Sequence, residues 1–171
     1  MPLYLLDTDT ISELMAGAHR QRGKKIRAWL QSRGNEPVVL SSVSISEINR
    51  GITLLEARNP VAATALRQAL NGILSIYEDA IITPSHAEWQ LFAKLSAVSA
   101  LRYLCHGKND KNQARTGADV FLAVQANTIA ATIASLNARD FVMIGRHLPI
   151  IGGIIDPASG TWITEPGSAE A

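Results

Sequence analysis

Short apolar runs and longer amphipathic segments alternate along the chain. Four runs rich in apolar residues lie at positions 3–6, 38–40, 80–82 and 132–136, and a fifth, shorter one lies at 154–155. Apolar runs of this length that end at turn residues are typical of strands buried on both faces of a sheet. The pattern therefore predicts four buried strands, with residues 154–155 as a last edge strand.

Between these runs, apolar side chains recur every three or four residues, which is the spacing of one face of a helix. Pro60 suits the first turn of a helix, and Ser85 and Thr116 are residue types that commonly precede one. Helices are predicted within residues 8–17, 26–34, 47–55, 60–77, 85–101 and 116–130. Strands that alternate with helices predict an α/β fold, here a three-layer α/β/α sandwich with a mainly parallel central sheet of four to five strands.

The composition is typical of a single globular domain. The chain has 171 residues, of which 47% are hydrophobic and 18% are charged, and this argues against a disordered protein. We assign residues 1–157 to one domain and residues 158–171 to a C-terminal tail. The single cysteine, Cys105, excludes an internal disulfide and a cysteine-rich zinc site. No stretch approaches the roughly 20 apolar residues of a membrane span, and no basic leader begins the chain, so we expect a cytoplasmic protein.

Two basic clusters stand out against a formal net charge of only +1. Each is more readily explained as a solvated face or loop, although two such stretches beside an acidic site would suit a phosphate backbone. The clusters are His19, Arg20, Arg22, Lys24, Lys25 and Arg27, and Arg102, His106, Lys108, Lys111 and Arg115.

Acidic residues follow the predicted strands. Asp7 and Asp9 come directly after the first strand, Glu47 follows the second, and Asp119 opens a late helix. In parallel sheets, ligands bind beyond the carboxyl ends of the strands, and a carboxylate there is costly to bury without a partner. The same residues also have structural explanations as helix caps. Thr8 or Asp9 would cap the first helix, and the segments 44–47 and 116–119 both match the pattern of a capping box.

Two more polar residues follow the fourth predicted strand. Asn137 lies nearest the strand end and Asp140 lies three residues later, so the two share a face if residues 137–141 form a helical turn. Alternatively, Asp140 pairs with Arg139 or Arg146 on the surface, where such pairs contribute only about 0–1 kcal/mol.

Taken together, these motifs resemble those of the PIN-domain family, and especially the VapC-type toxins of bacterial toxin–antitoxin pairs. The resemblance spans about residues 3–141. One departure is Asp9, which stands where many relatives have asparagine and adds a further carboxylate. The motifs are Leu5-Leu-Asp7-Thr-Asp-Thr-Ile-Ser-Glu-Leu14, Ser44-Ile-Ser-Glu47-Ile-Asn-Arg-Gly51, Ala118-Asp119-Val-Phe-Leu-Ala-Val-Gln-Ala126 and Asn137-Ala-Arg-Asp140-Phe141.

The resemblance implies a Mg²⁺-dependent endoribonuclease, with Mn²⁺ as a substitute, that hydrolyses RNA with a metal-activated water. It implies that Asp7, Glu47 and Asp119 bind the metal and that Asp140 or Asn137 completes the site. Carboxylates are ligands that Mg²⁺ prefers, and a cation relieves the repulsion between them. Thr8 or Ser42 would hydrogen-bond a carboxylate or a metal-bound water, and the residues expected around the ligands are Thr8, Asp9 and Asn137.

The resemblance also implies partners. We expect an RNA substrate, a cognate antitoxin protein, and a homodimer or a larger complex with the antitoxin. Apolar residues beyond what the helices need to pack, such as Leu54, Leu55 and Ile73, support such an interface.

Two alternative functions compete with this interpretation. The segment from Asp7 to Thr10 also resembles the Asp-x-Asp-x-Thr motif of haloacid-dehalogenase-like phosphatases, in which Asp7 would be the nucleophile and Asp9 the acid and base. That chemistry also needs a well-placed lysine, and Lys94 is expected in the middle of a helix. The second alternative is a non-catalytic module that binds a metal or a basic peptide in the acidic pocket.

Overall fold

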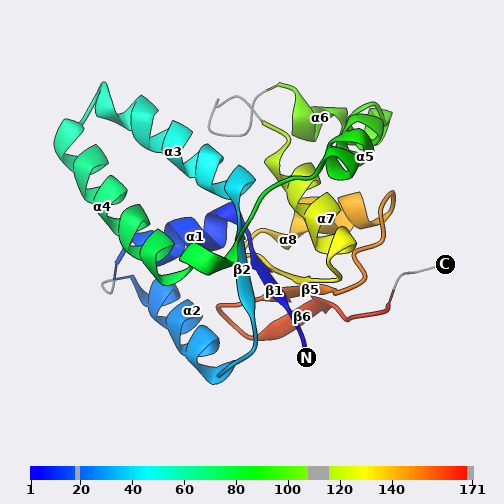
Figure 1. The fold of residues 1–171 in the computed structure, drawn as a ribbon, viewed down its shortest axis with the longest axis horizontal. Coiled ribbons are helices and arrows are strands. Elements are labelled where there is room, and N and C mark those ends of the chain that lie inside the picture. The colour runs from blue at the N-terminus through cyan, green and yellow to red at the C-terminus, as the bar shows by residue number, and fades with distance from the viewer. Residues whose placement is uncertain (18–19, 108–115, 169–171) are drawn as a thin grey trace.

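The computed structural model describes residues 1–17, 20–107 and 116–168. In this part of the chain, six strands form one sheet in the order β3–β2–β1–β4–β5–β6 (Figure 1). Every pair of neighbours is parallel except β5 and β6, which are antiparallel. The strands are β1 (Tyr4–Leu6), β2 (Val38–Ser41), β3 (Ile81–Ile82), β4 (Thr132–Ala134), β5 (Ile154–Asp156) and β6 (Thr161–Thr164).

Helices cover both faces of this sheet, so the predicted three-layer α/β/α sandwich is confirmed. In Figure 1, α1 to α4 gather on one side and α5 to α8 on the other. The longer helices are α1 (Thr8–Met15), α2 (Gln21–Ser32), α3 (Ser42–Glu56), α4 (Pro60–Ile76), α5 (His86–Ser96), α7 (Ala118–Thr128) and α8 (Ala138–Gly145). The short ones are α6 (Arg102–Cys105) and the 3₁₀ turns η1 (Glu78–Ala80) and η2 (Ser99–Leu101).

Alternation along the strands divides the core between the two layers. Tyr4 and Leu6 pack with the helices of the first layer, whereas Leu5 between them packs with those of the second. The same alternation separates Ala134 from Ile133, because successive side chains of a strand point to opposite faces. Strand β1 is buried on both faces, and this explains why its sequence is continuously apolar.

The carboxyl ends of the three central strands lie side by side. Leu6 is in register with Leu40 of β2 and with Ala134 of β4. The residues at or just past these positions are Asp7, Ser41 and Ser135, and the Asp7 amide donates to the Ala134 carbonyl at 3.2 Å. This edge of the sheet is therefore where side chains from distant motifs come together.

The edge of the sheet beyond β5 differs from the prediction. Residues 154–155 do form a strand, but β6 covers it, so the sheet has six strands rather than four or five. Strand β6 lies within residues 158–171, the segment that we assigned to a tail. Its residues are mostly exposed, as expected of an antiparallel edge strand that faces solvent.

Several helix boundaries also differ from the prediction. Helix α3 begins at Ser42, capped by the Ser41 side chain, whereas we expected residues 41–46 to lead into it. Helix α5 ends at Ser96, and Leu101 is buried in the separate turn η2. Ala130 lies beyond α7 with a positive φ of 51°, outside the helix predicted to include it. None of the helices in the described ranges is long and apolar enough to cross a membrane.

The two predicted basic clusters are only partly described. Most of the first lies on α2, which packs against α1, and there Arg27 donates to the Leu14 carbonyl at 2.6 Å. Arg27 therefore serves helix packing and is not part of a solvated basic face. Arg102 and His106 are exposed. His19, Lys108, Lys111 and Arg115 lie outside the described residues.

Candidate active site

Asp7 is buried at the carboxyl end of β1, with only 3% of its surface exposed. It is the N-cap of α1, and its Oδ1 accepts the Thr10 amide at 2.6 Å, while its Oδ2 accepts the Ser135 hydroxyl. The cap is therefore Asp7 itself and not Thr8 or Asp9. Burial raises the pKa of Asp7 to about 6, although the hydrogen bonds from Ser135 and Thr10 oppose this shift.

Glu47 joins three elements of the fold. Its Oε2 accepts the Thr8 hydroxyl at 2.9 Å, and its Oε1 accepts the Thr116 hydroxyl at 3.0 Å. Because α3 starts at Ser42, Glu47 lies in the second turn, and it takes no part in capping. The capping-box explanation of residues 44–47 is therefore wrong, and so is the expectation that Glu47 lies in a first helical turn.

Asp119 lies in the first turn of α7, as predicted. The N-cap is Gly117 with a positive φ of 74°, and Thr116 contacts Glu47 instead of capping the helix. The pKa of Asp119 is raised to about 7, first by burial and then by the negative charges of Asp7, Glu47, Asp140 and Asp9. Desolvation and nearby negative charges both disfavour the ionised form of a carboxyl group and so raise its pKa. Asp119 is thus the residue that all the predicted acids surround.

Asp140 and Asn137 are at the start of α8. Asn137 is the N-cap but makes no capping hydrogen bond with its side chain, whereas its amide donates to the Ser135 hydroxyl at 3.0 Å. Asp140 lies in the first turn, as the shared helical face required, and its charge contributes to the raised pKa of Asp119. Ser135 therefore links Asn137 to Asp7. Asp9 is exposed at the beginning of α1.

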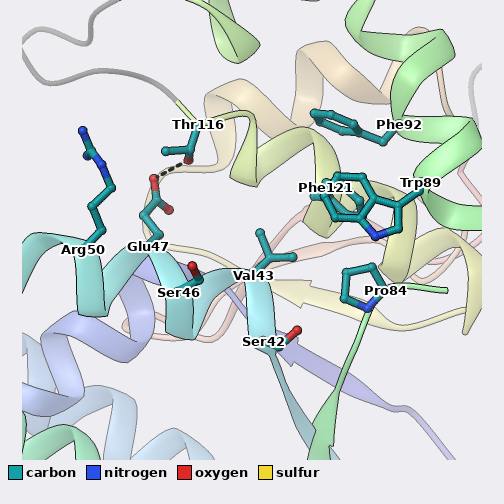
Figure 2. A pocket seen from close by; sticks show the side chains of 10 residues that line it. All are labelled: Ser42, Val43, Ser46, Glu47, Arg50, Pro84, Trp89, Phe92, Thr116 and Phe121. Carbon is teal, nitrogen blue, oxygen red and sulfur yellow. Dashed lines mark hydrogen bonds between the residues drawn. The ribbon is translucent and has the colours of Figure 1, made fainter. Parts of the chain in front are cut away.

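A pocket of about 360 Å³ opens beside Glu47 (Figure 2). One wall comes from the first three turns of α3, and the facing wall comes from aromatic side chains of α5 and α7. Ser42, which we expected beside a carboxylate, lines this pocket. The lining residues are Ser42, Val43, Ser46, Glu47, Arg50, Pro84, Trp89, Phe92, Thr116 and Phe121.

The close packing at Gly117 sets the position of Thr116 and Asp119. A Cβ atom at Gly117 would lie 2.9 Å from Cζ of Phe92, closer than real Cβ contacts, and the positive φ there also favours glycine. This glycine lets the loop pass directly over the aromatic wall before α7 begins. The hydroxyl of Thr116, just before this glycine, donates to Glu47 of α3, and Asp119, just after it, lies in the first turn of α7.

The donor set of the site suits a hard divalent cation. Oxygen atoms of Asp7, Glu47 and Asp119 are supplied from three elements, and the repulsion recorded in the pKa of Asp119 is what a cation relieves. Across residues 1–17, 20–107 and 116–168, no three His, Cys, Asp or Glu side chains are already arranged to hold a metal ion.

Several residues of the site could not be predicted from local patterns. Ser135 and Thr116 contact Asp7 and Glu47, which are 128 and 69 residues away in the sequence. Trp89 lies within the helix predicted at residues 85–101, and its position there gives no sign that 53% of its surface is exposed. Arg50 is exposed one turn after Glu47, a spacing that the motif itself could have suggested.

The chain has the α/β/α fold that the motifs predicted, with Asp7 at the carboxyl edge of the sheet. No family model matches the chain. The chain is 26% identical to Toxin FitB of Neisseria gonorrhoeae (strain ATCC 700825 / FA 1090) over 140 residues. This match covers 81% of this chain and 91% of that toxin.

Solved structures agree with this similarity. FitAcB from Neisseria gonorrhoeae matches with a TM-score of 0.62 at 23% identity, over 90% of this chain and 97% of that chain. VapBC2 from Rickettsia felis, bound to a DNA fragment from their promoter, matches with a TM-score of 0.55 at 18% identity, over 82% of this chain and 91% of that chain. The predicted resemblance to VapC-type toxins is therefore confirmed, and the chain has the fold of these structures.

Proposed function

We propose that this protein is the toxin of a toxin–antitoxin pair and that it hydrolyses RNA phosphodiester bonds with the help of Mg²⁺. The observation that carries the proposal is the environment of Asp119, whose pKa is raised to about 7 by burial and by four other carboxylates. Perturbed acids gathered at the carboxyl edge of a parallel sheet are typical of an active site. The similarity to Toxin FitB supports the toxin role.

The residues that would hold the metal are Asp7, Glu47 and Asp119, with Asp140 beside them. A bound Mg²⁺ supplies Lewis-acid activation of water and neutralises charge at the phosphodiester. The protein contributes orientation. Two threonine hydroxyls fix the Glu47 carboxylate, and Ser135 and the Thr10 amide fix that of Asp7.

Asp119 connects metal binding to proton release. Near neutral pH its carboxyl group is partly protonated because its pKa is about 7. A carboxylate must lose its proton to ligate a cation, so metal binding and deprotonation of Asp119 are coupled. Below pH 7 the protein should therefore release a proton as the metal binds.

We also propose a protein partner and a homodimer. The solved relatives include FitAB bound to a DNA fragment and VapBC2 bound to a promoter fragment. Of the three apolar residues that motivated a dimer, Leu54 is exposed, while Leu55 and Ile73 pack against the core. Val61 and Ile76 of α4 are exposed as well, so the α3–α4 pair presents apolar surface. Light scattering at micromolar concentration tests the dimer, and a monomer would exclude it.

The phosphatase alternative is less well supported. Both oxygens of Asp7 already accept hydrogen bonds and the group is almost fully buried, whereas a nucleophile must reach the phosphorus of its substrate. Asp9 is exposed at the start of α1, and Lys94 is in the last turn of α5.

The deciding experiment compares RNA cleavage by three chains: the wild type, Asp119→Asn and Glu88→Gln. Glu88 is a matched control because it is an acid of a helix start with a capping role. We expect cleavage by the wild type and Glu88→Gln in Mg²⁺ or Mn²⁺, none in EDTA, and little by Asp119→Asn. Cleavage that persists in EDTA would exclude the metal mechanism, and turnover of a phosphomonoester would favour the phosphatase. Harmless overexpression in a host without the antitoxin would exclude the toxin role.

A further inference from the structure

The pocket beside Glu47 has two walls of different chemistry (Figure 2). The polar wall belongs to α3 and to Thr116, and among the described residues that line the pocket it carries the one cation, Arg50. The opposite wall is aromatic and apolar. A volume of about 360 Å³ lies within the roughly 300–1,000 Å³ range of small-molecule sites.

The aromatic wall is held rigidly by its own packing. Phe92 and Phe121 stack with their ring centroids 4.5 Å apart at an interplanar angle of 25°. Trp89 meets Phe121 edge-on, at 4.3 Å and 74°, and Phe92 at 5.9 Å and 88°. Such pairs fix ring orientation beyond the area that they bury. The indole of Trp89 is therefore fixed in place.

Trp89 is nevertheless the most accessible ring of this cluster. It is 53% exposed, whereas Phe121 beneath it is 3% exposed. A tryptophan whose only task was packing would be turned inward, since burying its large apolar ring is what stabilises a core. Here two phenylalanines support an indole that lines the pocket, which is the arrangement of a stacking platform.

Arg50 stands on the other side of the pocket. It is exposed and lies one helical turn after Glu47, and in Figure 2 its side chain extends alongside Glu47 and Thr116. A flat aromatic surface with a guanidinium across from it matches a nucleotide, which has a planar base and an anionic phosphate. Glu47 belongs to both the pocket and the carboxylate cluster, so a nucleotide bound here would adjoin the candidate active site.

We propose that this pocket binds one nucleobase of the RNA strand, stacked on Trp89, while Arg50 contacts a neighbouring phosphate. The inference rests on the proposed function, because it assigns the position of the substrate at that same site. Stacking is tolerant of sequence, because every base has a π face. The pocket therefore contributes affinity and places the strand relative to the carboxylates.

The test measures binding on a chain that does not cleave. A labelled four-nucleotide oligoadenylate is titrated, with fluorescence anisotropy as the readout, into Asp119→Asn carrying either no further change, Trp89→Leu or Trp162→Leu. Leucine keeps apolar bulk but removes the ring, and Trp162 is a matched control on β6, outside the lining of the pocket. The same backbone without bases is the ligand control.

We expect Trp89→Leu to weaken binding of the oligoadenylate about fivefold or more, the lower end of what one stacked base contributes, and Trp162→Leu to leave it unchanged. The base-free strand should bind more weakly and should not respond to Trp89→Leu. In a chain with Trp162→Phe, where the buried Trp29 is the only other indole, the oligoadenylate should also quench the emission of Trp89.

Equal binding by Trp89→Leu and Trp162→Leu, or equal binding of the base-bearing and base-free strands, would overturn the proposal. The proposal would also be overturned if the emission of Trp89 changed on addition of a purified antitoxin but not on addition of the oligoadenylate. The pocket would then bind a peptide and not a nucleobase. The two failures are distinguishable. If the wild type cleaves RNA but Trp89→Leu does not weaken binding, the proposed function stands and the base-binding pocket is excluded. If Trp89→Leu weakens binding but the wild type cleaves no RNA, the proposed nuclease activity is excluded.

Discussion

Replacing Asp119 by asparagine should stabilise the metal-free protein at alkaline pH. The pKa of Asp119 is about 7 in the folded protein and 3.8 for the unperturbed group. Because the pKa is higher in the folded protein, the folded state binds more protons than the unfolded state at pH values between these two pKa values. The free energy of unfolding of the wild type therefore falls as the pH rises through this window. Asparagine keeps the shape of the side chain but has no proton to lose, so its contribution does not change with pH.

The magnitude follows from the difference between the two pKa values. At about 1.4 kcal/mol for each pKa unit, ionising Asp119 in the folded protein costs about 4 kcal/mol above pH 7. Since the side chain is only partly buried, solvent screening lowers this figure, and we expect about 2–4 kcal/mol. For a chain of this size the change corresponds to about 5–15 °C in Tm. Near pH 4 the advantage should almost vanish.

The assay is thermal and urea unfolding in EDTA at pH 4, 6 and 8. Asp79→Asn serves as a control, because Asp79 is an exposed acid in the turn η1. Saturating Mg²⁺ should raise the Tm of the wild type, because a ligand stabilises the state that binds it. The difference in Tm between the wild type and Asp119→Asn should therefore become smaller. An Asp119→Asn protein that is less stable than the wild type at pH 8 in EDTA would refute the reasoning, and so would a gap independent of pH.

Four further substitutions test the roles of individual residues. Glu47→Gln should remove most RNA cleavage without lowering the Tm. Glu88→Gln removes a negative charge from the first turn of α5 but keeps an oxygen that can accept the Ser85 amide, so it should lower the free energy of unfolding by about 0.3–1 kcal/mol and spare cleavage. Kinetics and urea unfolding that show the reverse would contradict this assignment. Gly117→Ala should cost about 1–2 kcal/mol or more, because φ is 74° and its Cβ would meet Phe92, and wild-type stability in urea would be incompatible with that packing. Asp140→Asn should weaken the affinity for Mg²⁺ and slow cleavage, but less than Asp119→Asn does. Cleavage rates equal to those of the wild type across a magnesium titration would restrict Asp140 to a structural role.

The sequence predicted the central strands and the acids well, because local patterns determine them. The apolar run at residues 3–6 is typical of a strand buried on both faces, and an acid directly after such a strand is expected at the sheet edge. Residues 161–164 were not recognised as a strand, because they lie near the end of the chain next to a segment rich in Gly, Ser and Glu, and their side chains are mostly exposed. Their strand depends on pairing with β5, which is a tertiary effect.

The contacts that organise the site were less predictable. The pattern Ser-x-x-Glu matches a capping box equally well at 44–47 and at 85–88, yet only the second forms one. The difference is that Ser41 begins α3 three residues earlier, which moves Glu47 into the second turn and frees it for Thr8 and Thr116. Hydrogen bonds between residues so far apart in sequence follow from the fold, and no local pattern encodes them.

The central claim is that the carboxylates around Asp119 form a divalent-metal site, and calorimetric titration of Mn²⁺ tests it most directly. The titration compares the wild type, Asp119→Asn and the capping control Glu88→Gln, at pH 6 and pH 8. We predict that the wild type and Glu88→Gln bind Mn²⁺ and release a proton at pH 6 but hardly any at pH 8, since the pKa of Asp119 is about 7. Asp119→Asn should bind far more weakly. Equal Mn²⁺ affinity of all three proteins, or binding without proton release at pH 6, would contradict the account.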